Sequence, residues 1–319
     1  MPFQSLEPTI DKRQRTTSIG YDAEKSLQTC NLRFPIENGR ITNWDDMELV
    51  WDHAFKRIKL SDKRILMTAD PDEVNRKQLL EKFFNKYSPA AVLLANQAVL
   101  SLFASGRSTG VVINFGEGTS HVVPIYENSV IKQFVQKWDN NGKALTEKLK
   151  KTLEQAGFRP SYILAKEIKE KYCYVALDPQ EEIKSFTPKS HDLSDGQRIE
   201  IGLEAFRCPE VLFQEYSIDK VILDTVRKCD SGIQKTLFAN IVLTGGSTLL
   251  RGFSERLKKE IEQQAEANVE IIRLDDCTLS AWKGGCKIVS EKLFSEKWIT
   301  KDEFESGADT LLSKYIYSI

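Results

Sequence analysis

The clearest pattern of apolar and polar positions lies in residues 110–127, GVVINFGEGTSHVVPIYE, where two apolar runs flank a short turn. Residues 111–113 form the first run and residues 122–125 form the second. Short apolar runs bounded by turn residues are typical of buried strands. Gly116 and Gly118 permit the positive φ angles of a tight turn. The segment is therefore predicted to form a β-hairpin.

The tip of this hairpin has two interpretations. Its backbone N–H groups can point together at one anion, which favours a phosphate-binding turn. Glu117 lies beside the glycines, so a bound phosphate would need a metal cation between the two negative charges. An ordinary tight turn explains the same residues, because short glycine motifs are weak evidence of a ligand.

A second pattern lies in residues 241–261, IVLTGGSTLLRGFSERLKKEI, which predicts an apolar strand, a Gly-Gly turn and a helix. The apolar positions of the helix recur at a spacing of four: Phe253, Leu257 and Ile261. A strand that runs into such a turn leaves backbone N–H groups that suit the phosphates or ribose of a nucleotide. A tight strand-to-helix corner without a ligand is the alternative.

Composition excludes several classes of function. The 319 residues carry a formal net charge of -1 and 29% of them are charged, which is unlike the basic balance of a nucleic-acid-binding protein. No apolar stretch approaches the roughly 20 residues of a membrane span, and no signal-like apolar core follows Met1. The six cysteines are scattered, without a C-x-x-C pair, and are interpreted as reduced thiols, with Cys173 in a buried packing position. We expect neither a nucleic acid nor a membrane as a direct partner.

Several segments of the chain resemble actin and the actin-related proteins: PIENG at 35–39, ITNWDDME at 41–48, QAVLSLFASGR at 97–107, IKEKYCYVALD at 168–178, FRCPE at 206–210 and WKGG at 282–285. The hairpin and the Gly-Gly turn match the same family. The resemblance is family-specific and covers almost the whole chain. It implies the α/β fold shared by actin, the heat-shock chaperone ATPases and the sugar kinases, a ribonuclease H-like fold in which two lobes close on ATP and a divalent metal.

The resemblance also implies a division of the fold into four parts. They are expected at 1–34 for the small outer subdomain, 35–104 plus 280–319 for the large outer one, 105–140 plus 219–279 for the inner base, and 141–218 for the inner upper part. A length of 319 residues suits two lobes. The hinge is expected near 103–106, where helical residues run into Ser and Gly.

The chain departs from the family at its N-terminus. Actins begin with a phosphate-binding hairpin that carries an acidic residue and Gly-Ser-Gly, and this sequence has none before residues 14–26, QRTTSIGYDAEKS, which already match the family. The outer-lobe sheet is therefore expected to be incomplete at the N-terminus. Each buried backbone group left unpaired costs about 1–3 kcal/mol, so we expect either another segment in the gap or a poorly stable outer lobe.

Three residues correspond, by resemblance, to catalytic positions of the family: Gln97, His121 and Asn114. The first two keep the family's glutamine and histidine. Asn114 stands where actins have an aspartate that holds the water shell of the metal, and its amide brings no charge and cannot act as a base. Glu117 replaces a further aspartate and would reach a metal only through water, so no direct metal ligand is expected. Hydrolysis is therefore expected to be weak or absent.

The nucleotide contacts implied by the family fall into two groups. The phosphates are expected at the turn residues Gly116, Glu117, Gly118 and Thr119. Adenine and ribose are expected at Lys169, Glu170, Gly245, Gly246, Ser247 and Leu249. Because the opposite phosphate hairpin is absent from the sequence, we expect ATP or ADP with Mg to bind weakly.

The expected partner surfaces depart from the family as well. The helix from Ala281 carries charges at a spacing of four: Lys283, Lys287 and Glu291. The matching positions in actins are largely apolar and receive helices of actin-binding proteins, so these charges oppose such partners. A charged stripe on a solvated helix explains the same residues.

Two further departures argue together against a standard filament. The segment between 214 and 229 is shorter than in the family, and Asn38 replaces a histidine that actins methylate.

Three functions remain open. We expect a cytoskeletal or structural actin-like protein of the cytoplasm or nucleus that polymerises poorly, has at most a residual ATPase, and binds actin or actin-related subunits and other cytoskeletal proteins. The second function is that of an ATP-dependent filament protein whose N-terminal segment is missing from this sequence. The third interpretation is a degenerate actin copy without an independent role.

Overall fold

The chain forms two compact units in the computed structural model, which describes residues 18–20, 23, 33–69, 76–138, 141–193, 196, 198–291 and 297–307. The first unit comprises Met1–Gly106, Asn128–Val130 and Thr278–Ile319, and the second comprises Arg107–Glu127 and Ile131–Cys277. The small outer subdomain expected at 1–34 lies outside the described residues, apart from 18–20, 23 and 33–34. The four-part subdivision and the hinge stay predictions.

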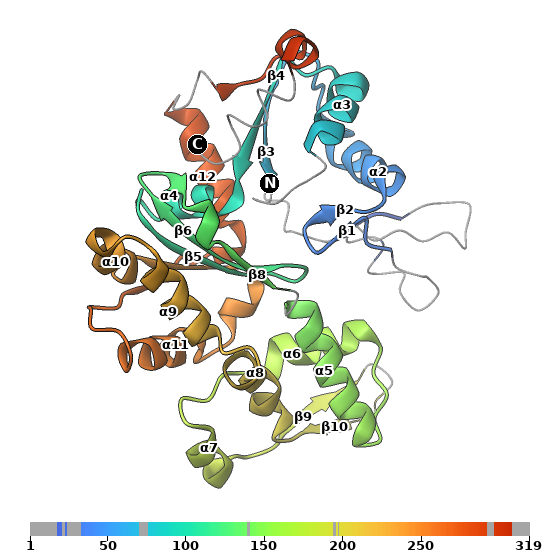
Figure 1. The fold of residues 1–319 in the computed structure, drawn as a ribbon. Coiled ribbons are helices and arrows are strands. Elements are labelled where there is room, and N and C mark those ends of the chain that lie inside the picture. The colour runs from blue at the N-terminus through green and yellow to red at the C-terminus, as the bar shows by residue number, and fades with distance from the viewer. Residues whose placement is uncertain are drawn as a thin grey trace. The chain divides into compact units, whose positions relative to one another are not determined.

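The first unit combines helices with short strand pairs (Figure 1). Its helices are α2 (Trp44–Phe55), α3 (Arg76–Tyr87), α4 (Gln97–Ala104) and α12 (Ser280–Ser290). Strands β1 (Ile36–Glu37) and β2 (Arg40–Ile41) pair antiparallel, and β3 (Arg64–Ala69) and β4 (Ala91–Asn96) pair parallel. The two-residue strand β7 (Ser129–Val130) also belongs to this unit.

Asn43, in an extended conformation, is the N-cap of α2, and its side-chain Oδ1 accepts a hydrogen bond from the Asp46 backbone N–H at 3.0 Å.

An aromatic cluster holds α2 against α3. Trp51 of α2 packs edge-on against Phe83 and Tyr87 of α3, with ring centroids 5.4 and 6.4 Å apart. Trp51 and Phe83 are buried, so these ring contacts form part of the core of the first unit.

The second unit is built on a mixed sheet in the order β12–β11–β5–β6. Strands β5 (Gly110–Phe115) and β6 (Ser120–Tyr126) pair antiparallel, while β11 (Ile241–Thr244) runs parallel to both β5 and β12 (Ile271–Arg273). Strand β8 (Gln136–Trp138) pairs antiparallel with β6. Every residue of β5 and β11 is buried, which is expected of central strands covered on both faces.

Helices surround this sheet and extend the unit beyond it. They are α5 (Gly142–Gln155), α6 (Tyr162–Tyr172), α7 (Pro179–Ser185), α8 (Glu204–Gln214), α9 (Ile218–Lys228), α10 (Ser231–Phe238) and α11 (Phe253–Glu262). Three-residue and four-residue 3-10 turns occur at η1 (Lys132–Phe134), η2 (Gly246–Leu249) and η3 (Cys277–Leu279).

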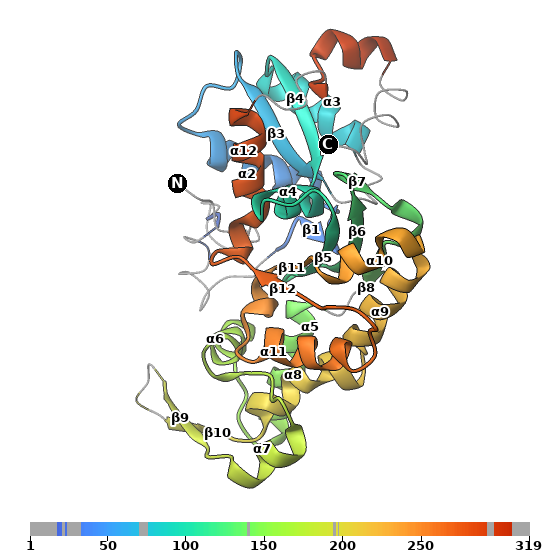
Figure 2. The ribbon, with the colours of Figure 1, turned by 90° about the vertical axis from the view of Figure 1, so that its left-hand side faces the viewer.

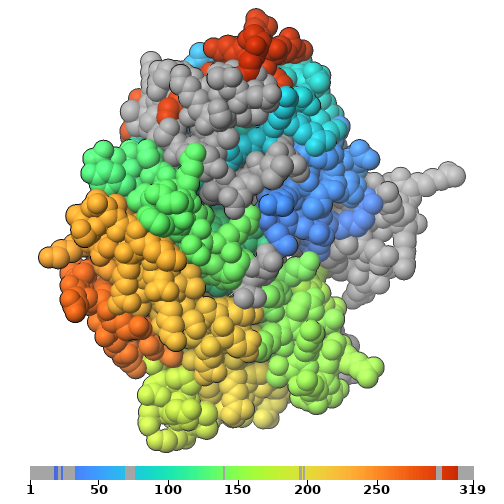
Figure 3. All heavy atoms as spheres, in the orientation of Figure 1, coloured from blue at the N-terminus to red at the C-terminus, as the bar shows by residue number. Residues whose placement is uncertain are grey.

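Two views place these elements within the second unit. Helices α9 and α10 contact β6 and β5 and form an orange stretch of the unit's surface in Figure 3. The antiparallel pair β9 (Lys189–Asp192) and β10 (Arg198–Ile201) lies with α7 at the end of the unit away from the sheet (Figures 1 and 2).

The structure confirms the local predictions made from periodicity. The runs at 111–113 and 122–125 lie in β5 and β6, and the predicted helix is α11, whose apolar positions are fully buried. Cys173 is buried, as expected. Lys283 and Lys287 lie on α12, and Glu291 is its C-cap residue. None of the helices in the described part of the chain is long and apolar enough to cross a bilayer.

Candidate functional site

The candidate site begins at the tip of the β5–β6 hairpin. Asn114 pairs with His121 and Phe115 with Ser120 across the two strands. The Gly116 N–H then closes the turn by donating to the Thr119 carbonyl at 3.0 Å. Among the described residues, the backbone N–H groups of Glu117 and Gly118 donate to no other protein group. Two backbone donors at the tip therefore have no acceptor within the described part of the protein, an arrangement that also occurs in anion-binding turns.

Asn114 and His121 lie next to each other on the buried face of this hairpin. They are 4% and 3% exposed, and their register pairing brings their side chains within cross-strand contact. The Asn114 Oδ1 accepts a hydrogen bond from the Thr244 hydroxyl at 3.2 Å. An amide in this position can orient water but cannot take a proton from it.

Gly245 lies directly against the end of β5. Its φ angle is +87°, in the region that favours glycine. A Cβ at this position would collide with the Phe115 carbonyl and would lie 2.8 Å from Asn114 Oδ1. The glycine therefore allows the turn after β11 to approach the hairpin, and the adjacent Gly246 has no neighbour within 4 Å of its own Cβ position.

The start of α5 also contacts the hairpin tip, through backbone and side-chain hydrogen bonds. The Gly142 N–H donates to the Gly116 carbonyl at 2.8 Å, and the Lys143 N–H donates to the Glu117 carbonyl at 2.9 Å. The Asn141 side-chain amide donates to the Gly118 carbonyl at 2.9 Å, while its Oδ1 caps α5. These bonds fix the backbone of the tip relative to the helix N-terminus, where the macrodipole favours negative charge.

A buried lysine completes this arrangement. Lys169, on α6, is 5% exposed, and its Nζ donates to the Gly142 carbonyl at 2.9 Å and contacts Glu117 Oε2 at 3.5 Å. The Tyr162 hydroxyl donates to the other carboxylate oxygen, Glu117 Oε1, at 2.6 Å. The Glu117 side chain is thus held on both oxygens by groups from α6.

The turn after β11 contributes the remaining candidate residues. Ser247 and Thr248 are buried in η2, and the Thr248 hydroxyl donates to the Gly245 carbonyl at 2.7 Å. Leu249 is 48% exposed, so its apolar side chain is accessible to a planar ring such as adenine. Ser247 Oγ lies 3.0 Å from where a Cβ of Gly142 would be, which places η2 beside the start of α5.

The structure brings most of the residues predicted from sequence together in the second unit. Glu117, Lys169, Gly245 and Ser247 lie around the hairpin tip, and Glu170 follows Lys169 on the exposed side of α6. Gln97 lies at the start of α4 in the first unit, so its role at this site stays a prediction. Within the described residues, no cluster of three metal-binding side chains occurs.

Sequence reasoning missed three residues of this site: Asn141, Gly142 and Tyr162. An Asn before the apolar periodicity of α5 is a recognisable N-cap signal and could have identified the first two. Tyr162 carries no such signal, because its contact with Glu117 joins residues 45 positions apart.

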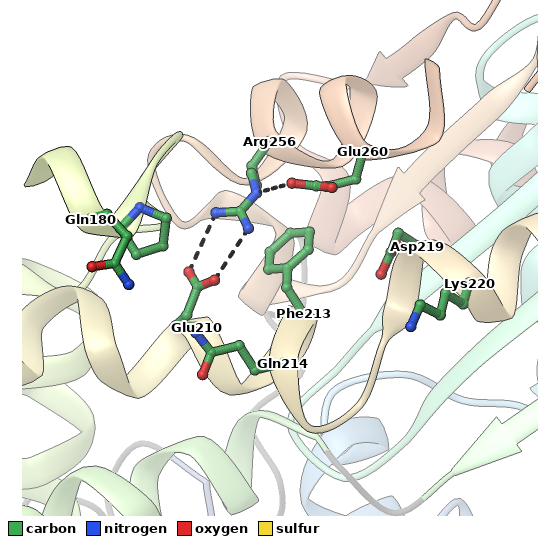
Figure 4. A pocket seen from close by; sticks show the side chains of 9 residues that line it. Gln180, Glu210, Phe213, Gln214, Asp219, Lys220, Arg256 and Glu260 are labelled. Atoms are coloured by element: carbon green, nitrogen blue, oxygen red, sulfur yellow. Dashed lines mark hydrogen bonds and ion pairs between the residues drawn. The ribbon is translucent and has the colours of Figure 1, made fainter. Parts of the chain in front are cut away.

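A separate cavity of about 230 Å³ lies elsewhere in the second unit. Figure 4 shows the Arg256 guanidinium between the carboxylates of Glu210 and Glu260, beside the Phe213 ring. Burial raises the pKa of Glu210 above its usual value, and Arg256 offsets that rise only in part. Arg256 is held by both carboxylates and by the Ala176 carbonyl, which indicates a structural role for this group.

The model of the family described as Actin matches residues 5–167 and 163–316. The matched ranges include the hairpin, the start of α5, Lys169 and the Gly-Gly turn, so the site described above falls within the matched region.

Proposed function

The chain belongs to the actin family, and from this premise we propose that it is an actin-like structural protein whose second unit binds ATP or ADP weakly and hydrolyses ATP slowly or not at all. The two α/β units agree with the two-lobed fold of that family. The observation that carries the proposal is the hairpin tip, where backbone donors are retained next to a buried Asn114 that replaces a carboxylate.

The residues present fit the phosphates and ribose of a nucleotide in part. The N–H groups of Glu117 and Gly118 are available to an anion, and Gly246 has no neighbour within 4 Å of its Cβ position, so the backbone there is open to close approach. The Ser247 hydroxyl and the exposed Leu249 side chain suit a ribose and a purine ring. A nucleotide would be held mainly by backbone groups and by η2.

The same residues limit the chemistry at the phosphates. ATP, when bound, would supply the phosphoanhydride bond, and its magnesium ion would neutralise the charge that develops on the phosphates as this bond breaks. Asn114 offers an amide in place of a carboxylate, and its Oδ1 already accepts the Thr244 hydroxyl. The neighbouring His121 is buried beside it. Neither side chain adds a carboxylate to anchor the water shell of a metal, so positioning of the attacking water is weakened.

We also propose that the protein polymerises weakly and binds helical actin partners weakly, and the charged residues on α12 support this. Lys287 is exposed and donates to the Ala104 carbonyl at 3.3 Å, and Glu291 is exposed at the C-cap. An apolar partner helix would have to desolvate these charges. We therefore propose actin-related subunits and other cytoskeletal proteins as partners, in the cytoplasm or nucleus, through other surfaces.

Titration with a fluorescent ATP analogue and magnesium tests the proposal. We expect saturable binding weaker than micromolar, reversed by excess unlabelled ATP, and phosphate release close to the background without protein. Submicromolar affinity together with brisk phosphate release would instead favour an ATP-dependent filament protein. Little soluble protein on expression would favour a degenerate actin copy.

A further inference from the structure

We infer that the cavity around Arg256 binds a guanidinium group on an aliphatic chain, as at the end of an arginine side chain, and that Asp219 is its principal acceptor. Three carboxylates line this cavity together with Arg256: Glu210, Asp219 and Glu260. The inference concerns a second site and does not depend on nucleotide binding.

Asp219 is a buried carboxylate with little compensation from the protein. It is the second residue of α9 and is 6% exposed. Among the described residues, its Oδ1 accepts no hydrogen bond, and its Oδ2 has one contact, with the Gln264 amide nitrogen at 3.5 Å. The N-terminus of α9 makes a negative charge tolerable here, but a buried carboxylate still favours a charged donor.

Arg256 is not available to Asp219, because the other two carboxylates hold it. Its Nη2 lies 3.2 Å from Glu210 Oε1, and its Nε lies 2.6 Å from Glu260 Oε1. Lys220 also lines the cavity, but it is exposed and forms no ion pair within the described part of the chain. The negative charge of Asp219 is therefore left for a ligand to neutralise.

The last turn of α11 lies next to Asp219 and adds to the attraction for a cation. The Gln264 amide nitrogen that contacts Asp219 also lies 3.4 Å from the Glu260 carbonyl oxygen. Glu260 belongs to the last turn of α11, where the helix macrodipole favours positive charge. A cation beside Asp219 would thus be attracted by the carboxylate and by the end of this helix.

The size of the cavity limits the class of ligand. Its volume of about 230 Å³ is below the roughly 300–1,000 Å³ of sites that enclose whole small molecules, so it suits the end of a chain. The described residues contain no cluster of three metal-binding side chains, which disfavours a divalent ion that needs many oxygen ligands.

The walls of the cavity favour a guanidinium over a compact ammonium. In Figure 4 the Phe213 ring lies between Glu210 and Asp219, and Pro179 adds a second apolar wall. These side chains suit an aliphatic stem, while the planar guanidinium can donate two parallel hydrogen bonds to one carboxylate.

A fluorescent Gly-Arg-Gly peptide, followed by anisotropy at low ionic strength, tests the inference. We expect saturable binding in the submillimolar range by the full chain. A peptide with citrulline in place of arginine has nearly the same shape without the charge and should not bind. Competition by agmatine as strong as that by N-acetyl-arginine amide would assign the site to a free guanidine compound, and weaker competition by agmatine would assign it to an arginine of a protein partner.

Two substitutions with opposite expected effects test the role of Asp219. Asp219→Asn should weaken binding of the arginine peptide about tenfold, whereas Asp224→Asn, at an exposed position of the same helix, should leave it unchanged. Lys220→Gln should tighten binding about threefold, because it removes a cation that repels the ligand. A purely structural role of Asp219 would not produce this gain.

The unfolding midpoint separates loss of binding from loss of the fold. Asp219→Asn should keep the midpoint of the parent, since it neutralises a buried charge that has no ion pair within the described residues. Equal binding of the arginine and citrulline peptides, absence of binding to the parent, or unchanged affinity in both Asp219→Asn and Lys220→Gln would each overturn the inference. Failure of ATP-analogue binding would refute only the proposed nucleotide site.

Discussion

At the scale of single residues, Asn114 is the side chain on which the proposed weakness of hydrolysis depends. It is buried opposite His121 at the end of β5, and its carbonyl oxygen is already held by the Thr244 hydroxyl. A carboxylate at this position could accept the same hydrogen bond and also carry the charge that a metal-bound water requires. The proposed weakness of hydrolysis thus depends on one missing charge at this position.

Restoring that charge gives the first prediction. Asn114→Asp should raise magnesium-dependent phosphate release about tenfold over the parent, since a positioned carboxylate contributes at least this much to proton transfer. The control Asn268→Asp, on an exposed loop of the second unit, should leave the rate unchanged. Equal rates for parent and Asn114→Asp at saturating ATP would show that Asn114 does not limit the reaction.

Gly245 supports a second prediction at the same scale. Gly245→Ala should destabilise the protein by about 2 kcal/mol or more, because alanine must adopt a positive φ and would clash with the Phe115 carbonyl. Its neighbour offers a matched control, since a Cβ at Gly246 meets nothing within 4 Å. Gly246→Ala should therefore cost about 0.5 kcal/mol or less. Urea denaturation measures both, and equal losses would contradict the steric argument.

At the scale of elements, paired charges join α2 to α3 in the first unit. Lys86 donates to Glu48 at 3.1 Å and to Asp52 at 2.8 Å, and the Tyr87 hydroxyl donates to Asp52 at 2.8 Å. The hydrogen bond from Lys82 lowers the pKa of Glu48. Burial raises the pKa of Asp52, but the bonds from Lys86 and Tyr87 outweigh it, and the net pKa is lowered.

These lowered pKa values predict how the contribution of Lys86 depends on pH. A carboxylate with a lowered pKa in the folded state stabilises the protein above its unfolded pKa, and this stability is lost as the pH falls through the folded pKa. Lys86→Met should therefore cost about 0.5–1 kcal/mol at neutral pH and much less below about pH 4. The control Lys59→Met, at an exposed position, should show no such dependence. Urea denaturation across this pH range would refute the prediction if the cost stayed constant.

The elements also show how much of the site could be predicted from sequence. The pattern of apolar residues predicts β5, β6 and α11, because a short apolar run and an apolar spacing of four are local properties of the sequence. It cannot predict that β11 pairs with β5, since that register joins Thr244 to Asn114 across 130 positions. The bonds from Asn141 and Tyr162 to the hairpin tip are long-range in the same way. The resemblance to a family supplied the site residues, and the contacts among them required the structure.

At the scale of the whole molecule, assembly depends on surfaces and on the nucleotide together. The chain has a formal net charge of -1, so general repulsion between copies is small and does not by itself prevent association. Specific features must therefore decide whether the protein polymerises. The feature that we propose to oppose polymerisation is the pair of exposed charges on and next to α12, Lys287 and Glu291.

The last prediction concerns polymerisation. With magnesium and ATP, the protein should stay in the supernatant during high-speed centrifugation, and its pelleted fraction should equal that of a sample with EDTA. A conventional actin run in parallel would establish that the buffer supports filaments. The physical reason is that ordering each subunit in a filament costs entropy, which a sufficiently large interface must offset. Charged positions on α12 reduce the apolar area available for such an interface.

Pelleting that required magnesium and was accompanied by phosphate release would show that the nucleotide site is coupled to assembly, as in an ATP-dependent filament protein. Pelleting that occurred equally in EDTA would indicate assembly through a surface independent of the nucleotide.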